Sequence, residues 1–531
     1  MKEKRKLKLK RFSFHPITSF IIMTVIVMVI SFILSVLEVQ ATYSKVNTSG
    51  ELESVLVTVD NMLSIHGIKY IISNAGKVFV TFAPLSTLLM GLIGLSVAHA
   101  SGLIDAFIKK NTLKVNNTAL TFIIIFISTI SSIINEVGYV ILIPLSALVF
   151  LANRRNPLLG ITASFCGVAF GYGVTIFAGS AEINLVPITE QAARLVDGGF
   201  HVSLLSNWFA IMVSSIVVSI VGTYVIEHQV AKRVGRYHVF QEEASSETKE
   251  IKIEAVEREQ QKRLEAEVRE KKGLKYALIT FIVFVLLFAY MLIPGYPGSG
   301  ILLDMNEKAY INQLFGDNAY FQSGFTFLIS MLFIALGVAY ALGAKTIKND
   351  KEFVEKASNY VKDVGHIIAL IFFAALFIAV FKETKIGTLA VAVIANIIRS
   401  IPFSGIPLII TVLLLIALST VFMPTQYTKW AILAPSVVPL LMQNNISPQF
   451  TQFLFRAGDS MAKGGTPLLA YFVIYLGFLN IYNTEKDPIS IRKAITFISP
   501  YYLIIGITWI LISVLYYIIG IPIGPGVTPV L

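Results

Sequence analysis

The chain has 531 residues, of which 55% are hydrophobic and 14% are charged, and its formal net charge is +11. Soluble domains usually carry about a quarter charged residues. Apolar runs such as 17–37, 204–226 and 325–342 reach the roughly 18 residues that a membrane span needs. The composition therefore excludes a soluble or single-pass protein and predicts an all-α polytopic membrane protein.

The positive charge lies in short segments that flank the apolar runs. These segments are 2–11, 109–114, 154–155, 345–362 and 486–493. Lys and Arg beside membrane spans mark the cytoplasmic side, so we predict a cytoplasmic N-terminus in the cell membrane. The same distribution argues against nucleic acid as a partner and for membrane lipid.

Nine membrane-spanning helices are expected, with the C-terminus on the extracytoplasmic side. They are predicted at residues 17–37, 81–104, 157–178, 203–226, 274–294, 322–343, 365–381, 450–479 and 494–520. Segments 38–78 and 179–202 are expected outside the cell, with Glu182 solvated at the outer mouth. The charged stretch 227–273 is interpreted as a solvated helix on the cytoplasmic face, and 384–401 as an interfacial helix outside.

One apolar block consists of two runs that are too short to span a membrane comfortably. Ala119–Ile134 and Val137–Ala152 are separated by Asn135 and Glu136, and both outer flanks are basic. Non-helical backbone at membrane depth is tolerated only where protein or a cavity covers it. We therefore predict a re-entrant hairpin that enters from the cytoplasm, with two tilted complete helices as the alternative.

A second predicted hairpin, Ile406–Phe422 and Trp430–Met442, repeats the pattern of the first. Without a gap, Tyr139, Pro144, Pro157 and Gly167 match Trp430, Pro435, Pro448 and Gly458. The second hairpin is expected to enter from outside, so the two units are predicted to be inverted repeats, which characterise secondary transporters. A chance match of a few apolar letters is the alternative.

The predicted organisation alternates scaffold and transport regions. Two transport regions are predicted: residues 119–202, with the first hairpin and the broken third helix, and residues 404–485, with the second hairpin and the broken eighth helix. Residues 1–118 contain the first two helices, which are predicted to be scaffold. The remaining regions are 203–364, with the next three helices and the charged stretch, 365–403, with the seventh and interfacial helices, and 486–531, with the last helix and the C-terminus.

The eighth predicted helix carries the densest set of charges inside an apolar segment. Arg456, Asp459 and Lys463 share an arc of roughly 80° on an α-helix, beside a break at Gly464-Gly465. Charges at membrane depth are costly, so each is a functional candidate. Arg456 suits a substrate carboxylate because its guanidinium is two-pronged, and Asp459 suits a coupling proton or cation. A self-neutralising network of these three residues is the alternative.

Further candidates lie near this helix and at the first hairpin tip. Ser460 and Thr466 supply neutral oxygens, and Asn135 and Glu136 can bind a cation or a substrate; a solvated Glu136 is the alternative. Trp430 either stacks on a substrate ring or belongs to the apolar surface of the hairpin. The sequence contains no ATP-binding motif and no catalytic pair, so we expect no enzyme activity, no cofactor and no metal, and a proton or sodium gradient as the energy source.

Several segments resemble the p-aminobenzoyl-glutamate transporter (AbgT) family. They are 138–144, 343–348, 429–435, 447–452, 455–460, 466–469 and 520–526, in the order of the family. The resemblance implies a homodimer of nine-helix, two-hairpin protomers that imports p-aminobenzoyl-glutamate or exports antimetabolites such as sulfonamides. It also implies functional roles for Trp430, Pro448, Arg456 and Asp459, with Pro467 following.

The chain departs from the family pattern at the hairpin tips and after Asp459. Glu136 and Glu182 stand where aspartates are usual, and Lys463 stands where an asparagine is usual. We hypothesise that the ammonium group of Lys463 removes a sodium site, which leaves proton coupling or another anionic substrate. The sequence thus predicts a secondary transporter of a small organic anion with an elevator-like motion. An ion-coupled dicarboxylate-type importer with a different substrate is the alternative.

Overall fold

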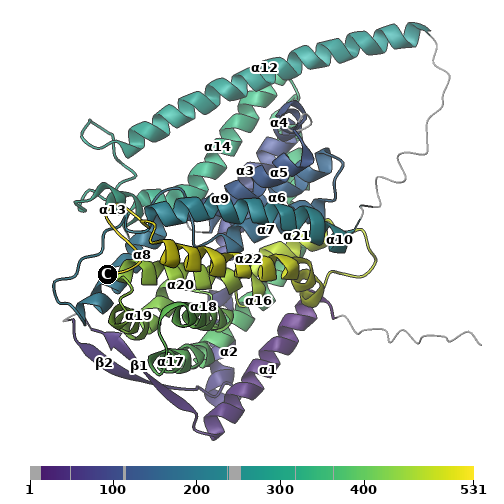
Figure 1. Cartoon of the computed structure of the whole chain (residues 1–531). Coiled ribbons are helices and arrows are strands. Elements are labelled where there is room, and N and C mark those ends of the chain that lie inside the picture. Colours follow the sequence, from purple (N-terminus) through teal and green to yellow (C-terminus); the bar gives the residue numbers. More distant parts are fainter. Residues whose placement is uncertain are drawn as a thin grey trace, which may run out of the picture.

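The computed structural model describes residues 14–47, 50–111, 115–134, 136–235, 237, 253–316, 318–362 and 364–531. These residues form helices and one antiparallel two-stranded sheet, which consists of β1 (Gln40–Val46) and β2 (Leu52–Thr58). Figure 1 shows the helices as one body with this small sheet at its edge. The prediction of an all-α polytopic membrane protein is confirmed.

Helices make up most of the described residues. In chain order they are α1 (Pro16–Val36), α2 (Ile65–Val80), α3 (Ala83–Ala100), α4 (Leu103–Asn111), α5 (Asn117–Ile130), η1 (Ser131–Ile134), α6 (Val137–Ala152), α7 (Pro157–Phe170), α8 (Ser180–Arg194), α9 (Trp208–Val225), η2 (Ile226–Val230), α10 (Ala231–Val234), α12 (Ile253–Leu292), α13 (Tyr310–Phe315), α14 (Tyr320–Ala344), α15 (Asp350–Lys362), α16 (Gly365–Glu383), α17 (Ile386–Arg399), α18 (Gly405–Phe422), α19 (Gln426–Gln443), α20 (Pro448–Ala462), η4 (Lys463–Gly465), α21 (Phe472–Ile481) and α22 (Ile491–Ile519).

Eight helical segments of the described residues are long and apolar enough to cross a membrane. They are Pro16–Val36, Ile65–Ala100, Trp208–Val234, Glu265–Leu292, Tyr320–Ala344, Gly365–Glu383, Gly405–Phe422 and Ile491–Ile519. One of them, α18, is the first arm of the second hairpin. The third and eighth predicted helices are not in this set because both are interrupted. The seven segments other than α18, together with these two interrupted helices, agree with the nine predicted spans.

The two hairpins open toward opposite ends of the molecule. Asn156, at the base of the first hairpin, donates a 3.0 Å hydrogen bond to the carbonyl of Gly235, just beyond α10. Ser447, at the base of the second hairpin, bonds instead to Pro529. The same C-terminal segment bonds to the beginning of α9 through Ile523 and Ala210. Since α9 and α10 join these two ends (Figure 1), the hairpins are inverted relative to each other.

Matched glycines allow the same close helix packing in both repeats. A Cβ atom on Gly167 would lie 2.9 Å from the carbonyl oxygen of Ile125 in α5, and one on Gly458 would lie 2.8 Å from Cγ2 of Ile416 in α18. The two isoleucines are separated by the same number of residues as the two glycines. In each repeat, the helix after the hairpin therefore packs closely on the first hairpin arm only because it carries glycine.

Some predicted boundaries were wrong. The third helix ends at Phe170 rather than near 178, and α8 follows within the segment that was expected to be an outer loop. The segment 38–78 contains β1, β2 and α2. Residues 253–273 of the charged stretch are not a separate helix, because they continue into the fifth span as part of α12.

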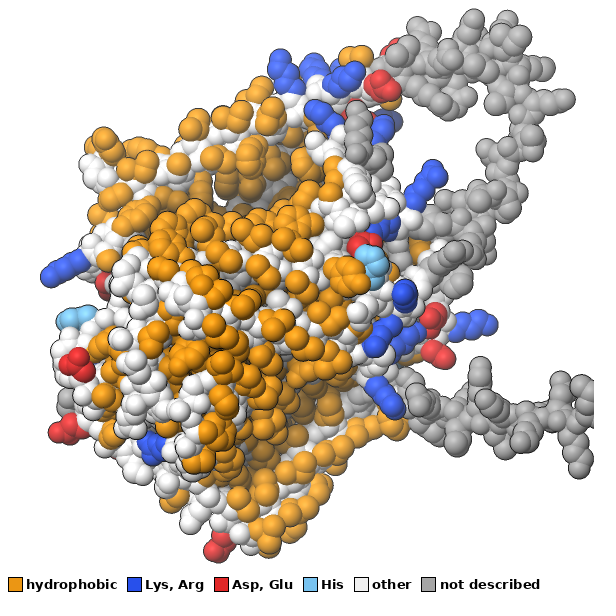
Figure 2. All heavy atoms as spheres, viewed as in Figure 1, with side chains coloured by type: hydrophobic (Ala, Val, Ile, Leu, Met, Phe, Trp, Pro, Cys, Tyr) orange, Lys and Arg blue, Asp and Glu red, His pale blue; other side chains and the backbone are white. Residues whose placement is uncertain are grey.

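Charge and apolar surface are separated on the outside of the molecule. Figure 2 shows a wide apolar surface, with Lys and Arg side chains gathered at the side where α10 lies in Figure 1. This arrangement is typical of a protein whose middle contacts lipid and whose basic end faces water.

Candidate functional site

The interruptions of the third and eighth predicted helices both contact the opposite repeat. The non-helical segment 171–179 lies against α20: the Gly173 amide donates to Ser460 Oγ at 2.8 Å, and Arg456 Nε donates to the Gly173 carbonyl at 2.8 Å. A Cβ on Gly173 would lie 2.4 Å from Ser460 Oγ, so the contact requires glycine. In return, a Cβ on Gly464 in η4 would lie 2.5 Å from the ring of Phe170.

Arg456 is ion-paired with Glu182, and both side chains are almost fully buried. The expectation that Glu182 is solvated at an outer mouth is therefore wrong. The reason is the turn before α8: the Gly179 amide donates to Glu182 Oε2 at 2.6 Å, which places the first turn of α8 beside α20. Arg456 Nη2 is buried and has no hydrogen-bond partner among the residues that the structure describes.

Asp459 belongs to a second ion cluster, which is separate from Arg456. Lys429, from the second hairpin, forms an ion pair with its Oδ1, and neither side chain is exposed to solvent. Lys463 Nζ lies 3.8 Å from Oδ2. Thr420 and Gln426 donate to the two carboxylate oxygens at 3.2 and 3.3 Å. The three charges that the alternative interpretation joins in one network thus belong to two clusters that meet on α20.

Lys429 is a site residue that sequence reasoning missed. In the sequence it belongs to the family-like segment 429–435, and a lysine within an apolar hairpin arm carries the same signal as Arg456. Its partner was not identifiable, because Asp459 lies 30 positions further along the chain and the pair depends on how α19 packs on α20.

The first hairpin reaches the site through an aromatic ring. Lys463 Nζ lies 2.9 Å from the centroid of the Tyr172 ring, in a cation–π contact. The Tyr172 hydroxyl donates to Glu136 Oε1 at 3.4 Å, and Glu136 is half-buried. The structure thus brings Glu136 toward Lys463. Asn135 lies outside the described residues.

Three other predicted residues have structural contacts around the site. Trp430 is fully buried, donates to Thr189 Oγ1 at 2.9 Å and stacks on Phe455 with ring centroids 4.3 Å apart. It therefore connects the second hairpin to α8 and α20, inside the protein and away from lipid. Thr466 Oγ1 donates to the Val421 carbonyl at 3.0 Å, which holds the break against the hairpin tip, and the half-buried Pro467 follows it.

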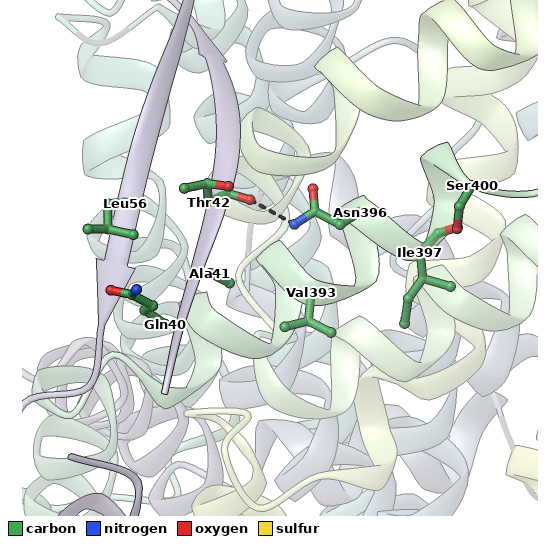
Figure 3. Close-up of a pocket in the computed structure, with 8 residues that line it drawn as sticks. All are labelled: Gln40, Ala41, Thr42, Leu56, Val393, Asn396, Ile397 and Ser400. Atoms are coloured by element: carbon green, nitrogen blue, oxygen red, sulfur yellow. Dashed lines mark hydrogen bonds between the residues drawn. The ribbon is translucent and has the colours of Figure 1, made fainter. Parts of the chain in front are cut away.

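Pro448 is not brought together with the ion pairs. It occupies the first turn of α20, where Ser447 caps the helix. At 1.5 Å per residue it lies about 12 Å from Arg456 along the axis. A surface pocket of about 610 Å³ also contains none of the ion pairs: it lies between β1, β2 and α17, where Asn396 donates to the Thr42 carbonyl at 2.8 Å (Figure 3). None of its lining residues is a predicted site residue.

The sequence matches the AbgT putative transporter family over residues 12–531. The chain belongs to this family. It is 29% identical over 515 residues to the p-aminobenzoyl-glutamate transport protein of Escherichia coli (strain K12), which covers 97% of this chain and 94% of that protein. The family assignment confirms the resemblance and identifies this chain as a membrane transporter of small organic substrates.

Two solved structures are also similar. The YdaH transporter of Alcanivorax borkumensis is 24% identical with a TM-score of 0.47, over 96% of this chain and 100% of that chain. MtrF of Neisseria gonorrhoeae, described with a class of antimetabolite efflux pumps, is 28% identical with a TM-score of 0.47, over 97% and 98%.

Proposed function

We propose that this AbgT-family protein carries a small organic anion whose carboxylate binds at Arg456. The observation that supports this most strongly is the buried guanidinium, which has an unused Nη2 although Nε and Nη1 are engaged. Arg binds carboxylates with two parallel N–H donors, so exchange of Glu182 for a substrate carboxylate would satisfy the whole group. The candidate substrates are those of the relatives: p-aminobenzoyl-glutamate and antimetabolites. Sulfonamides are the antimetabolites that we expect.

We further propose that protons rather than sodium ions drive transport. Two ammonium groups face the carboxylate of Asp459: Lys429 at Oδ1 and Lys463 at 3.8 Å from Oδ2. A sodium ion at this carboxylate would have to displace both and would be repelled by them. A proton bound to Asp459 would instead neutralise the carboxylate and release both lysines, and it needs no coordination space between them. Ser460, Thr466 and Glu136 would orient the groups that move.

The proposed transport cycle follows from the inverted repeats. The two hairpins, with α7, α8, α20 and α21, would move as a unit past the remaining helices, in the alternating-access manner of repeat-built transporters. Trp430, Pro448 and Pro467 would shape the substrate pocket. We propose that the protein is a homodimer in the cell membrane, with its basic end in the cytoplasm.

Proteoliposomes with imposed ion gradients test this function. We expect uptake of labelled p-aminobenzoyl-glutamate to respond to a pH gradient and to be unchanged when sodium replaces potassium. Arg456→Gln should abolish binding of the anion, and Asp459→Asn should abolish the response to pH. Strong dependence on sodium would contradict proton coupling, and binding unaffected by Arg456→Gln would contradict the anion site. Competition by simple dicarboxylates would identify the dicarboxylate-type alternative.

A further inference from the structure

One face of α20 carries a continuous polar stripe that extends beyond the ion pairs. Gln449, Gln452, Arg456, Asp459 and Lys463 fall within an arc of roughly 80° on an α-helix. Residues three or four positions apart on such a face are neighbours, so each side chain of the stripe adjoins the next. The proposed function uses the second part of the stripe and leaves the two glutamines without a role.

Both glutamines are buried and have unused hydrogen-bonding atoms. Gln449 is 8% exposed and Gln452 is 1% exposed. Asn207, at the beginning of α9, is 3% exposed and donates through Nδ2 to Gln452 Oε1 at 2.9 Å. Within the described part of the chain, Gln449 Oε1, Gln452 Nε2 and Asn207 Oδ1 have no hydrogen-bond partner.

Such a group of atoms points to a ligand. Buried side-chain amides in proteins are nearly always hydrogen-bonded, because an unpaired one loses its bonds to water without replacement. Rotating the amides of both Asn207 and Gln452 by 180° keeps the bond between them and again leaves one donor and one acceptor free. The site therefore suits a group that both donates and accepts hydrogen bonds. Arg456 Nη2, the next unused donor on the stripe, adjoins it.

We propose that Gln449, Gln452 and Asn207 form a second substrate subsite, which binds an uncharged nitrogen group such as an aromatic amine or a carboxamide. The inference rests on the proposed function, because it takes Arg456 as the binding point of the carboxylate. The helical rise places Gln452 and Gln449 about 6 and 10 Å from Arg456 along the axis. The transported molecule is then an elongated anion with its uncharged polar group far from the carboxylate.

Two compounds that differ only in the uncharged group test the subsite. The probes are p-aminobenzoyl-glutamate and benzoyl-glutamate, which lacks the amine, and the measurement is the Kd of each for the purified full-length protein. The wild-type protein should bind the amino compound about three- to tenfold more tightly. Gln449→Leu and Gln452→Leu should reduce this ratio to about one and leave the Kd of benzoyl-glutamate unchanged. Gln449→Glu, which retains an acceptor, should preserve the preference.

Thr451→Val is the matched control. Thr451 is fully buried on another face of α20, and among the described residues its hydroxyl bonds only to the Ser447 carbonyl within its own helix. Its removal should therefore leave the ratio at the wild-type value. An unchanged ratio in both glutamine-to-leucine variants would overturn the subsite, as would equal weakening of both compounds. Arg456→Gln distinguishes the two proposals: it should weaken both compounds equally. If it weakens neither, or if the wild-type protein binds neither, the proposed function is wrong and the subsite falls with it.

Discussion

The side chains of Lys429 and Asp459 are both fully buried, so each charge is compensated mainly by the other. Removal of one partner from a buried ion pair costs about 3–5 kcal/mol, because the other charge is left uncompensated. Lys463 remains near Asp459, so we expect Lys429→Met to lower the free energy of unfolding by about 3 kcal/mol. The measurement is thermal unfolding of the purified protein in detergent.

The double variant Lys429→Met/Asp459→Leu separates the pair from general packing. It should recover much of the lost stability, since an apolar pair replaces two charges. Lys486→Met, at an exposed lysine, is the control and should unfold like the wild-type protein. A double variant no more stable than the single one would show that charge pairing is not what stabilises this contact.

Glu182 competes with the substrate for Arg456 if the proposed function is right. Glu182→Gln keeps the shape of the side chain and removes its charge, so Arg456 should bind an anion about three- to tenfold more tightly. The folded protein should at the same time be less stable, because the arginine is left with a weaker partner. Binding of p-aminobenzoyl-glutamate measures the first effect. Weakening as strong as that of Arg456→Gln would instead make Glu182 part of the substrate site.

His15, at the N-terminus of α1, makes the stability of the protein depend on pH. Its Nδ1 accepts a hydrogen bond from the Ile17 amide at 3.2 Å, which only an unprotonated nitrogen can do. Burial, and secondly the nearby His366, hold the pKa of His15 below its ordinary value of 6.5. The folded state thus favours the neutral ring. Its contribution to stability is present above pH 6.5 and is lost as the pH falls through the lowered pKa.

We expect His15→Asn, which keeps an acceptor for the helix N-terminus, to remove part of this pH dependence. When the pH is lowered from 7.5 into the acid range, the thermal unfolding midpoint should decrease more for the wild-type protein than for the variant. Parallel curves for the two proteins would mean that other groups cause the acid sensitivity.

At the scale of elements, glycine decides how closely the repeated helices pack. Gly458→Ala would place Cβ 2.8 Å from Ile416, within the contact between α18 and α20. Such overpacking typically costs about 1–3 kcal/mol. Gly506→Ala in α22 is the control, because its Cβ would meet Met461 at an ordinary 3.6 Å and alanine favours the helix. Thermal unfolding should show a loss for the first variant and none for the second.

The elements themselves were largely predictable. Apolar runs and basic flanks located both hairpins, and the prolines in the first turn of α7 and α20 marked where these helices begin. Sequence reasoning failed at α8. Its mixture of polar and apolar residues is typical of a surface helix, whereas Glu182, Leu185 and Thr189 are buried against the second repeat. Amphipathic spacing shows that a helix has two faces but does not show what covers them.

At the scale of the whole molecule, we predict the orientation in the membrane: the basic end faces the cytoplasm. Glu51 and Lys486 are both exposed. Glu51 lies in the connection between β1 and β2, the strands that follow the C-terminal end of α1, and Lys486 lines a pocket with His15, which precedes α1. Cys166, the one native cysteine, is buried. A membrane-impermeant maleimide added to intact cells should therefore label Glu51→Cys and leave Lys486→Cys unlabelled until the cells are opened. The reverse pattern would contradict a cytoplasmic basic end.

The sequence by itself determined that this protein spans a membrane, that it contains two hairpins at matched spacing, and that α20 carries a charged face. Each of these follows from local properties: the length of apolar runs, the position of proline and glycine, and helical periodicity. The tertiary structure alone decided that Arg456 pairs with Glu182 and Asp459 with Lys429. Partners so distant along the chain are chosen by how the inverted repeats pack, and no local pattern records that packing.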